Sequence, residues 1–525
     1  FFFHARDQGF EGALERFGQI FTEPLFNESA LEREISAIDN EHSNNRFDPV
    51  QRNREALYSA SIPGHRAAKF RTGCRATLTA RPLPELRAAV QNMFNTYYTA
   101  QNMVLVLMGP FSFSVLKDFA VKYFSGIPSH RGTDTHGTPP PAAIEDPVLP
   151  FSVDTQGHTH LMLFQEPNAA EREVQIYWQI PGDYYKDWRE TPTQYITHLL
   201  GHASEGSVLA LLKARGWATG ISSDVSEAFS SFYVLFCHVV LTPEGFSHWE
   251  DVVTTIYAFL GMLLTQKPSF DHFEELHKID EIYYTFFQNF SDNLAATNFL
   301  AKRLFHGFPI EQILSSTICC TQFSPEKIKN VLTWMSPNNS VTQLIAPEAE
   351  QECTETGQWY GVRFSRARQV PDTVVARWMD AFKAGDMNGL HLPETNPFVP
   401  SLDECTILKP VEKGDVQRNP KCIFEDKQCT CFWKPGFEYG EPRFYSNILL
   451  ANNHAHCTLE EKCCAFLFTI AFSKSIETVN ALAAFAKIKW ELDDDERGLV
   501  LYFSGLSEKL KLYMEYVINQ IKAFE

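Results

Sequence analysis

Long hydrophobic runs are absent from this 525-residue sequence. Its longest apolar stretches, such as residues 256–264 and 463–472, are much shorter than the roughly 20 residues that a membrane-spanning helix requires. We therefore expect no membrane span.

Cysteine is also scarce, with 12 residues in the chain, which excludes a small scaffold held together by disulfides. We expect the adjacent pairs 319–320 and 463–464 to be thiols packed in cores. Scarce cysteine favours a reducing, cytoplasmic compartment. Secretion is left open, because the sequence starts at Phe1 without a methionine or a basic leader and is expected to be a piece of a longer protein.

Basic residues are fewer than acidic ones. Lysine and arginine number 46 against 64 aspartates and glutamates, so the formal net charge is −18. This balance disfavours nucleic acid and anionic lipid and suits neutral or cationic peptides. The sequence also lacks the G-x-x-x-x-G-K-[ST] loop that would cradle a nucleotide phosphate.

The composition is that of a folded protein, with 44% hydrophobic and 21% charged residues. Two stretches rich in proline, glycine and polar residues, 127–150 and 384–414, mark boundaries between domains. Helical spacing of apolar residues alternates with apparent strands at 103–108 and 231–236, which predicts an α+β fold. The expected domains are residues 1–147, 148–385 and 416–525, with a linker at 386–415.

An internal echo indicates that the blocks are copies of one fold. The skeleton N-x-V-x-x-L-x-x-P begins at Asn102 and again at Asn339, 237 residues later. This spacing agrees with the domain length read from the two linkers.

Two acids are the first candidates for chemistry. Glu34 and Glu41 lie in a helix expected over 28–44, and a heptad returns to the same face within about 20°. Ile38 lies near this stripe, so we expect both carboxylates to face the packed side, where a metal or a histidine would have to compensate them. The alternative is a pair of solvated acids on a charged helix.

A histidine pair offers a second candidate metal site. His198 and His202 are four residues apart, a spacing that can chelate zinc on a helix. However, Leu199 and Gly201 occupy the positions where the two common motifs place a catalytic glutamate. The simpler interpretation is a pair that caps or packs a helix ending near 204–206.

Strings spread over essentially the whole chain resemble the insulinase/pitrilysin family of inverted zinc peptidases. They are Glu11-Gly-Ala-Leu-Glu-Arg-Phe17, Pro24-Leu-Phe26, Arg33-Glu34-Ile-x-Ala37-Ile-Asp-x-Glu41-His42, Phe70-x-Thr72-Gly73, Tyr97-Tyr98-x-x-x-Asn102-Met103, His198-Leu-Leu-Gly-His202, Gly216-Trp217, Trp359-Tyr360-Gly361 and Leu392-Pro-x-x-Asn396-x-Phe398-x-Pro400. The resemblance implies repeated two-layer domains, each with a mixed, mainly antiparallel sheet covered by helices, which together enclose a peptide in a chamber. It identifies residues 1–147 as the later part of the catalytic domain, 148–385 as a non-catalytic domain and 416–525 as the start of a third.

The resemblance also assigns the two acids. In the family, Zn²⁺ is held by two histidines of an H-x-x-E-H helix and by a later glutamate, which Glu41 matches. Glu34 matches an acid that orients a ligand histidine. H-x-x-E-H itself is absent here, and the family places it upstream, so we expect this chain alone to be inactive and not to retain zinc. The alternative is a non-catalytic relative that binds peptides or serves assembly.

A peptide-anchoring exosite in the second domain is a further implication of the resemblance. The matching positions are His202, Gly206, Ile221, Ser222 and Ser223. Ser223 stands where the family member that has this exosite carries a glycine, which puts close approach of a peptide backbone in doubt. Strand addition needs only exposed main-chain groups, so the exosite is still expected.

Overall fold

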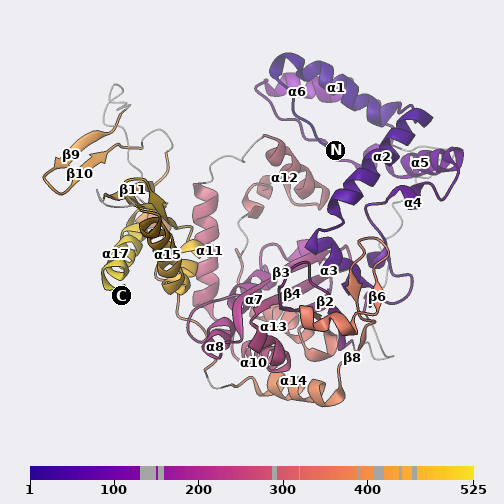
Figure 1. The fold of residues 1–525 in the computed structure, drawn as a ribbon. Coiled ribbons are helices and arrows are strands. Elements are labelled where there is room, and N and C mark those ends of the chain that lie inside the picture. Colours follow the sequence, from indigo (N-terminus) through magenta and orange to yellow (C-terminus); the bar gives the residue numbers. More distant parts are fainter. Residues whose placement is uncertain are drawn as a thin grey trace. The chain divides into compact units, whose positions relative to one another are not determined.

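The computed structural model describes residues 1–129, 149–151, 159–286, 293–317, 320–387, 389–405, 419–436, 440–451 and 458–524 (Figure 1). They form two compact units. Unit 1 comprises Phe1–Gly201, Leu211–Pro268 and Gln288–Leu390. Unit 2 comprises His202–Ala210, Ser269–Phe287 and His391–Glu525.

The amino-terminal part of unit 1 is helical. Its helices are α1 (Asp7–Thr22), α2 (Glu28–Asn45), α3 (Pro49–Tyr58), α4 (Arg75–Leu78), α5 (Leu83–Tyr97) and α6 (Phe113–Phe124). Asp48 caps α3 and Ser112 caps α6, each accepting a backbone N–H of the first turn. Helices α1 and α6 pack closely, because a Cβ on Gly18 would lie 2.5 Å from the carbonyl oxygen of Tyr123.

One mixed sheet forms the centre of unit 1. Its strands are β1 (Leu161–Gln165), β2 (Glu173–Pro181), β3 (Ala218–Ala228), β4 (Phe232–Leu241), β5 (Ser340–Ile345), β6 (Glu355–Thr356), β7 (Arg363–Phe364) and β8 (Arg368–Gln369). They run in the order β3-β4-β2-β5-β1-β7-β6, and β8 pairs with β1. Only the β1–β5 pair is parallel among the pairings described. The predicted α+β fold with a mixed, mainly antiparallel sheet is confirmed.

The helices that follow in the chain are α7 (Pro192–Leu200), α8 (Val208–Ala214), α9 (Pro243–Ser247), α10 (Trp249–Thr265), α12 (Asn293–Phe305), α13 (Pro325–Trp334) and α14 (Asp372–Ala384). Of these, α7, α9 and α13 contact strands of the sheet directly. α10 is apolar almost all round, as expected for a helix that is packed on two sides. Its Tyr257 ring packs on Trp178 of β2 and on Trp378 of α14, at centroid distances of 6.2 and 5.6 Å. α10 is therefore the middle layer between the sheet and α14 (Figure 1).

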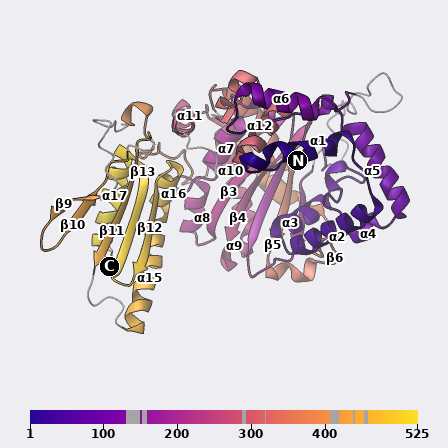
Figure 2. The same ribbon diagram turned by 90° about the horizontal axis from the view of Figure 1, so that it is seen from above.

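Unit 2 contains α11 (Phe270–Thr285) and an αβ part. Its other elements are β9 (Lys421–Glu425), β10 (Thr430–Trp433), β11 (Arg443–Ala451), α15 (Leu459–Ser475), α16 (Glu477–Phe485), β12 (Lys489–Asp495), β13 (Gly498–Leu506) and α17 (Ser507–Ala523). β11, β13 and β12 form an antiparallel sheet in that order, which Figure 2 shows as neighbouring strands. α15 and α17 pack on it around the buried rings of Phe472, Phe503 and Tyr513.

The structure confirms some of the predicted helices, strands and buried cysteines and contradicts others. The helix expected over 28–44 is α2, and the strand expected at 231–236 is part of β4. The strand expected at 103–108 is wrong: these residues are extended, but no strand pairs with them in the described part of the chain. Cys320 is buried as expected, whereas Cys463 and Cys464 are exposed on α15, so the core assignment is wrong for that pair. Cys319 lies outside the described residues.

No helix in the described ranges combines the length and the apolar character needed to cross a bilayer.

Candidate functional site

The two candidate acids share one face of α2. Glu34 and Glu41 are seven residues apart in the helix Glu28–Asn45, and both side chains are exposed. Among the described residues, neither carboxylate takes part in a hydrogen bond or an ion pair. The expectation that they face the packed side is therefore wrong, because Ile35 is the only fully buried residue of α2 and the stripe of acids lies beside it.

The donor set around Glu41 is incomplete for a metal. The described residues contain no group of three or more histidine, cysteine, aspartate or glutamate side chains placed to hold an ion. The neighbouring His42 packs edge-on against the rings of Phe70 and Tyr360, at 5.2 and 5.3 Å. A catalytic zinc site normally has three protein ligands, so these residues supply one ligand and do not fit a complete site.

A loop of unit 1 with two aromatic residues, Trp359 and Tyr360, contacts the neighbourhood of α2. Trp359 stacks on Phe70 with ring centroids 4.3 Å apart and planes 4° from parallel. The hydroxyl of Tyr360 lies 3.1 Å from that of Thr72. The carboxylate of Glu55 accepts the backbone N–H groups of Trp359 and Tyr360, at 2.8 and 2.9 Å. The sequence marked Trp359 and Tyr360 only through the family resemblance, and no pattern pointed to Glu55.

A charged cluster joins α3 to β3. Glu227 accepts from Arg54 at 2.6 Å, from Arg71 at 2.7 Å and from the hydroxyl of Tyr58 at 3.0 Å. Burial raises the pKa of Tyr58, and the negative charge of Glu227 raises it further. Sequence reasoning missed this cluster, because its acid is separated from its partners by more than 150 residues in the chain and the group has no local motif.

The proposed exosite residues fall in both units. In unit 1, Ile221, Ser222 and Ser223 lie on β3, which forms one end of the sheet order. Ser222 is exposed, and the hydroxyl of Ser223 donates to the carbonyl of Phe236 on β4 at 2.7 Å. The side chain of Ser223 is thus occupied within the sheet, while β3 has one edge that no other described strand covers.

In unit 2, His202 and Gly206 lie on the loop after α7. The Nδ1 of the buried His202 accepts from the backbone N–H of Ser204 at 3.3 Å and lies 2.8 Å from its hydroxyl. Burial, together with the charge of nearby His272, lowers the pKa of His202 to about 4. Helix α7 ends at Leu200, a few residues before the expected break. His202 therefore acts as a packed loop residue, in line with the simpler of the two interpretations of the histidine pair.

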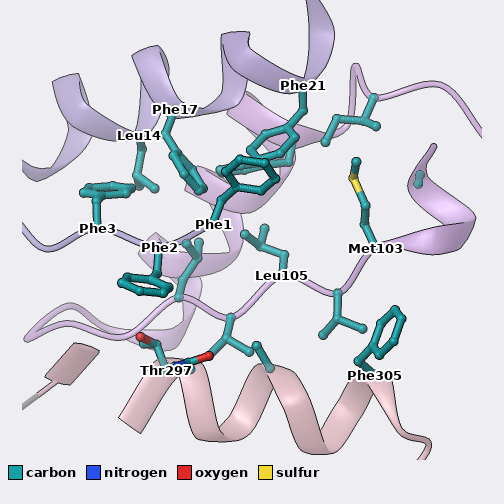
Figure 3. Close-up of a pocket in the computed structure, with 18 of the residues that line it drawn as sticks. Phe1, Phe2, Phe3, Leu14, Phe17, Phe21, Met103, Leu105, Thr297 and Phe305 are labelled. Atoms are coloured by element: carbon teal, nitrogen blue, oxygen red, sulfur yellow. The ribbon is translucent and has the colours of Figure 1, made fainter. Parts of the chain in front are cut away.

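An apolar cavity lies in unit 1. It has a volume of about 610 Å³ and is lined from α1, α12, the first three residues and the extended run 103–108. Figure 3 shows Phe1, Phe17, Phe21 and Leu105 around it, with Thr297 and Phe305 contributed by α12. Residues 104–108 make no main-chain hydrogen bond to any residue that the structure describes.

Comparisons with known proteins account for nearly the whole chain. Residues 1–69 match the model of the insulinase family (peptidase family M16), 86–279 match the inactive domain of peptidase M16, and 286–525 match the middle or third domain of peptidase M16. The three models follow one another without overlap.

Individual relatives agree with these models. Insulin-degrading enzyme from Homo sapiens is 26% identical over 537 residues, covering 100% of this chain and 50% of that protein. The putative zinc protease mug138 of Schizosaccharomyces pombe is 26% identical, covering 99% of this chain and 52% of that protein. Nardilysin from Pongo abelii is 24% identical and covers 100% and 44%. The chain thus spans about half the length of the curated relatives it matches.

The fold agrees as well. The crystal structure of pitrilysin superimposes with a TM-score of 0.77 over 99% of this chain and 53% of that one, at 20% identity. The three matched models show that the chain belongs to the insulinase family of peptidases, peptidase family M16.

Proposed function

We propose that the chain is part of a zinc-dependent metalloendopeptidase that degrades peptides enclosed in a chamber. The observation that carries the proposal is the match of the insulinase model to residues 1–69, the segment in which α2 presents Glu34 and Glu41 to solvent on one face. The human and fission-yeast relatives, named as insulin-degrading enzyme and putative zinc protease, support it.

In this proposal the missing ligands come from a segment that precedes Phe1 in the complete protein. Glu41 would be the third protein ligand of Zn²⁺, and Glu34 would hold a ligand histidine by its free ring N–H. When bound, the ion would activate water for attack on a peptide carbonyl. The 525-residue chain supplies one ligand, so we expect it to be inactive by itself.

The apolar cavity supports a missing segment. Its wall includes the extended residues 104–108, whose main-chain groups have no partner among the described residues. An extended run without a paired strand offers its main-chain groups to an added strand. A preceding segment that adds a strand would pair with this run.

Two segments are proposed to bind peptide, one in each unit. The open edge of β3, with Ile221, Ser222 and Ser223, can accept an extended peptide through main-chain hydrogen bonds. The loop with His202 and Gly206 is proposed to receive the amino end of a peptide. The side chain of Ser223 does not block the open edge of β3, because its hydroxyl donates to the carbonyl of Phe236 on the neighbouring β4.

The deciding experiment joins the chain to its natural preceding sequence. We expect H-x-x-E-H within the roughly 50 preceding residues, about the length of a helix and the strands that accompany it. The joined protein should bind about one Zn²⁺ per chain and cleave unstructured peptides, whereas the 525-residue chain should do neither. If the joined protein has the motif but binds no metal, the peptidase proposal is wrong.

The second candidate function is a non-catalytic protein of the same family that binds peptides or serves assembly. The observation in its favour is the match of residues 86–279 to the inactive domain of the family. Absence of H-x-x-E-H from the preceding sequence would favour it over the peptidase.

A further inference from the structure

Two buried side chains of α11 bind the backbone of residues 391–398, a segment that we call the strap. The Nε2–H of His272 donates to the carbonyl of Pro393 at 2.9 Å. One turn along the same helix, the carboxylate of Glu275 accepts the N–H of Asn396 at 2.8 Å. The two side chains are three residues apart on α11, and their partners Pro393 and Asn396 are three residues apart on the strap. The imidazole therefore pairs with a carbonyl and the carboxylate with an amide.

The hydrogen bonds around His272 involve both of its ring nitrogens. Since a carbonyl can only accept, Nε2 must carry the proton that reaches Pro393. The hydroxyl oxygen of Ser269 accepts the backbone N–H of His272, and this hydroxyl lies 2.9 Å from Nδ1, to which it can donate.

The carboxyl end of the strap continues into the core of the third domain. The side chain of Asn396 donates to the carbonyl of Leu482 at 2.7 Å and accepts the N–H of Phe398 at 3.0 Å. Phe398 is buried edge-on against Tyr513, 5.4 Å between ring centroids. Asn396 thus links α11 to the end of α16, and the strap is a structured element instead of a loose linker.

The amino end of the strap contacts the loop that carries the proposed peptide-binding residues. The N–H of His391 donates to the carbonyl of Gly206 at 3.1 Å. Gly206 has φ +82°, and a Cβ there would come within 2.3 Å of the imidazole of His391. The positive φ favours glycine at this position, and any side chain would also have to displace the imidazole of His391.

These contacts form one chain from the third domain to the loop 202–210, all within unit 2. We propose that the strap positions the loop of His202 and Gly206, with His391 and Asn396 as positioning residues, so that binding of a peptide's amino end at the loop and docking of the strap on α11 are coupled. The peptide part of this inference rests on the proposed function. Because coupling between two sites is reciprocal, a peptide seated at the loop must also protect the strap.

Amide hydrogen exchange on the full 525-residue chain tests the coupling without any need for catalysis. Glu275→Ala removes the acceptor for the strap, and exchange of the amides at 202–210 should become about tenfold faster even though Glu275 is not on that loop. Glu275→Gln keeps an acceptor oxygen and should restore slow exchange. Glu491→Ala, an exposed acid on β12 in the same unit, is the matched control and should leave the loop unchanged.

A peptide-binding measurement separates this inference from the proposed function. His391→Ala leaves the backbone bond to Gly206 in place but removes the ring that confines it, and should weaken binding of a fluorescein-labelled peptide with a free α-amino group about tenfold. The N-acetylated peptide should bind weakly to both proteins. Absence of binding to the unmodified chain would contradict the proposed peptide site alone, with the exchange result still standing.

Faster exchange confined to the strap in Glu275→Ala, with the loop 202–210 unchanged, would overturn the coupling. If Glu275→Ala does not fold, Asn396→Ala replaces it, because this change cuts the bonds to Leu482 and Phe398 while leaving both buried α11 side chains in place. Its expected result at the loop is the same, and an unchanged loop would count equally against the proposal.

Discussion

Glu55 binds the backbone of Trp359 through one carboxylate oxygen at 2.8 Å while its other oxygen accepts from Tyr360 at 2.9 Å. The two partners are more than 300 residues away in sequence, so one α3 side chain fixes a distant turn of unit 1. Trp359 in turn stacks on Phe70, and Tyr360 packs on His42 beside Glu41. The loop thus supports the part of α2 that carries the candidate metal ligand.

Removal of the Glu55 carboxylate should destabilise the fold. Glu55→Ala leaves two partly buried N–H groups without an acceptor, so we expect the free energy of unfolding to fall by about 3 kcal/mol. Glu15→Ala, at an exposed position of α1, should change it by less than about 0.5 kcal/mol. Urea unfolding followed by tryptophan fluorescence measures both. Equal stability of the two variants would show that the turn is held by its ring contacts alone.

The buried His202 predicts a pH dependence of stability. Its pKa of about 4 in the folded chain lies below the ordinary value of 6.5, so between these values the unfolded chain binds a proton that the folded chain does not. Stability should therefore fall as the pH drops from 6.5 toward 4, by roughly 3 kcal/mol from this residue. The variant His202→Asn should lose that part of the slope in unfolding curves measured across this window.

Glu275 should give stability the opposite dependence on pH. Burial raises its pKa above the ordinary 4.5, so the folded chain holds a proton in a range where the unfolded chain has lost it. The stability contribution of Glu275 therefore declines as the pH rises above 4.5. Comparing wild type with Glu275→Gln isolates this contribution, because glutamine does not titrate. A slope that is unchanged in Glu275→Gln would assign the pH dependence to other groups.

The role of Glu41 is testable in the complete protein. Glu41→Gln removes the charged oxygen donor, so we expect loss of most bound zinc and of most peptide hydrolysis. Glu28→Gln, at the exposed first turn of the same helix, is the control and should keep both. Zinc is measured by atomic absorption after dialysis. Normal metal content in Glu41→Gln would remove this residue from the ligand set.

Local sequence patterns predicted the elements but not their partners. The spacing of Leu31, Ile35 and Ile38 defined α2 almost to the residue, because a helix satisfies its own backbone. The extended run 103–108 was recognised correctly as extended, yet a strand also needs a neighbour, and none is present among the described residues. Its apolar composition could not reveal this, because pairing is a property of the whole sheet.

At the candidate site, too, local sequence patterns did not reveal which residues are in contact. The heptad of Glu34 and Glu41 was correct as geometry, but their exposure depends on which other elements cover α2. Glu55, Glu227 and Glu275 were not found, since each acid gains its role from a partner far away in the chain. No period or motif encodes such contacts, so tertiary structure was needed to find them.

The close contact of α10 and α14 gives a last, sharply defined prediction. A Cβ on Gly261 would lie 2.0 Å from the carbonyl oxygen of Phe382, a backbone atom that cannot move without displacing α14. Gly261→Ala should therefore lower the free energy of unfolding by more than about 3 kcal/mol, although alanine is the better helix former.

Gly9 on α1 is the matched control, because it has no atom within 4 Å of an added Cβ and Gly9→Ala should cause no loss of stability. Thermal unfolding of the two variants separates packing from helix propensity. If Gly261→Ala were as stable as Gly9→Ala, α14 could not be docked on α10 as described, and the aromatic contacts of Tyr257 with Trp378 would have to be abandoned with it.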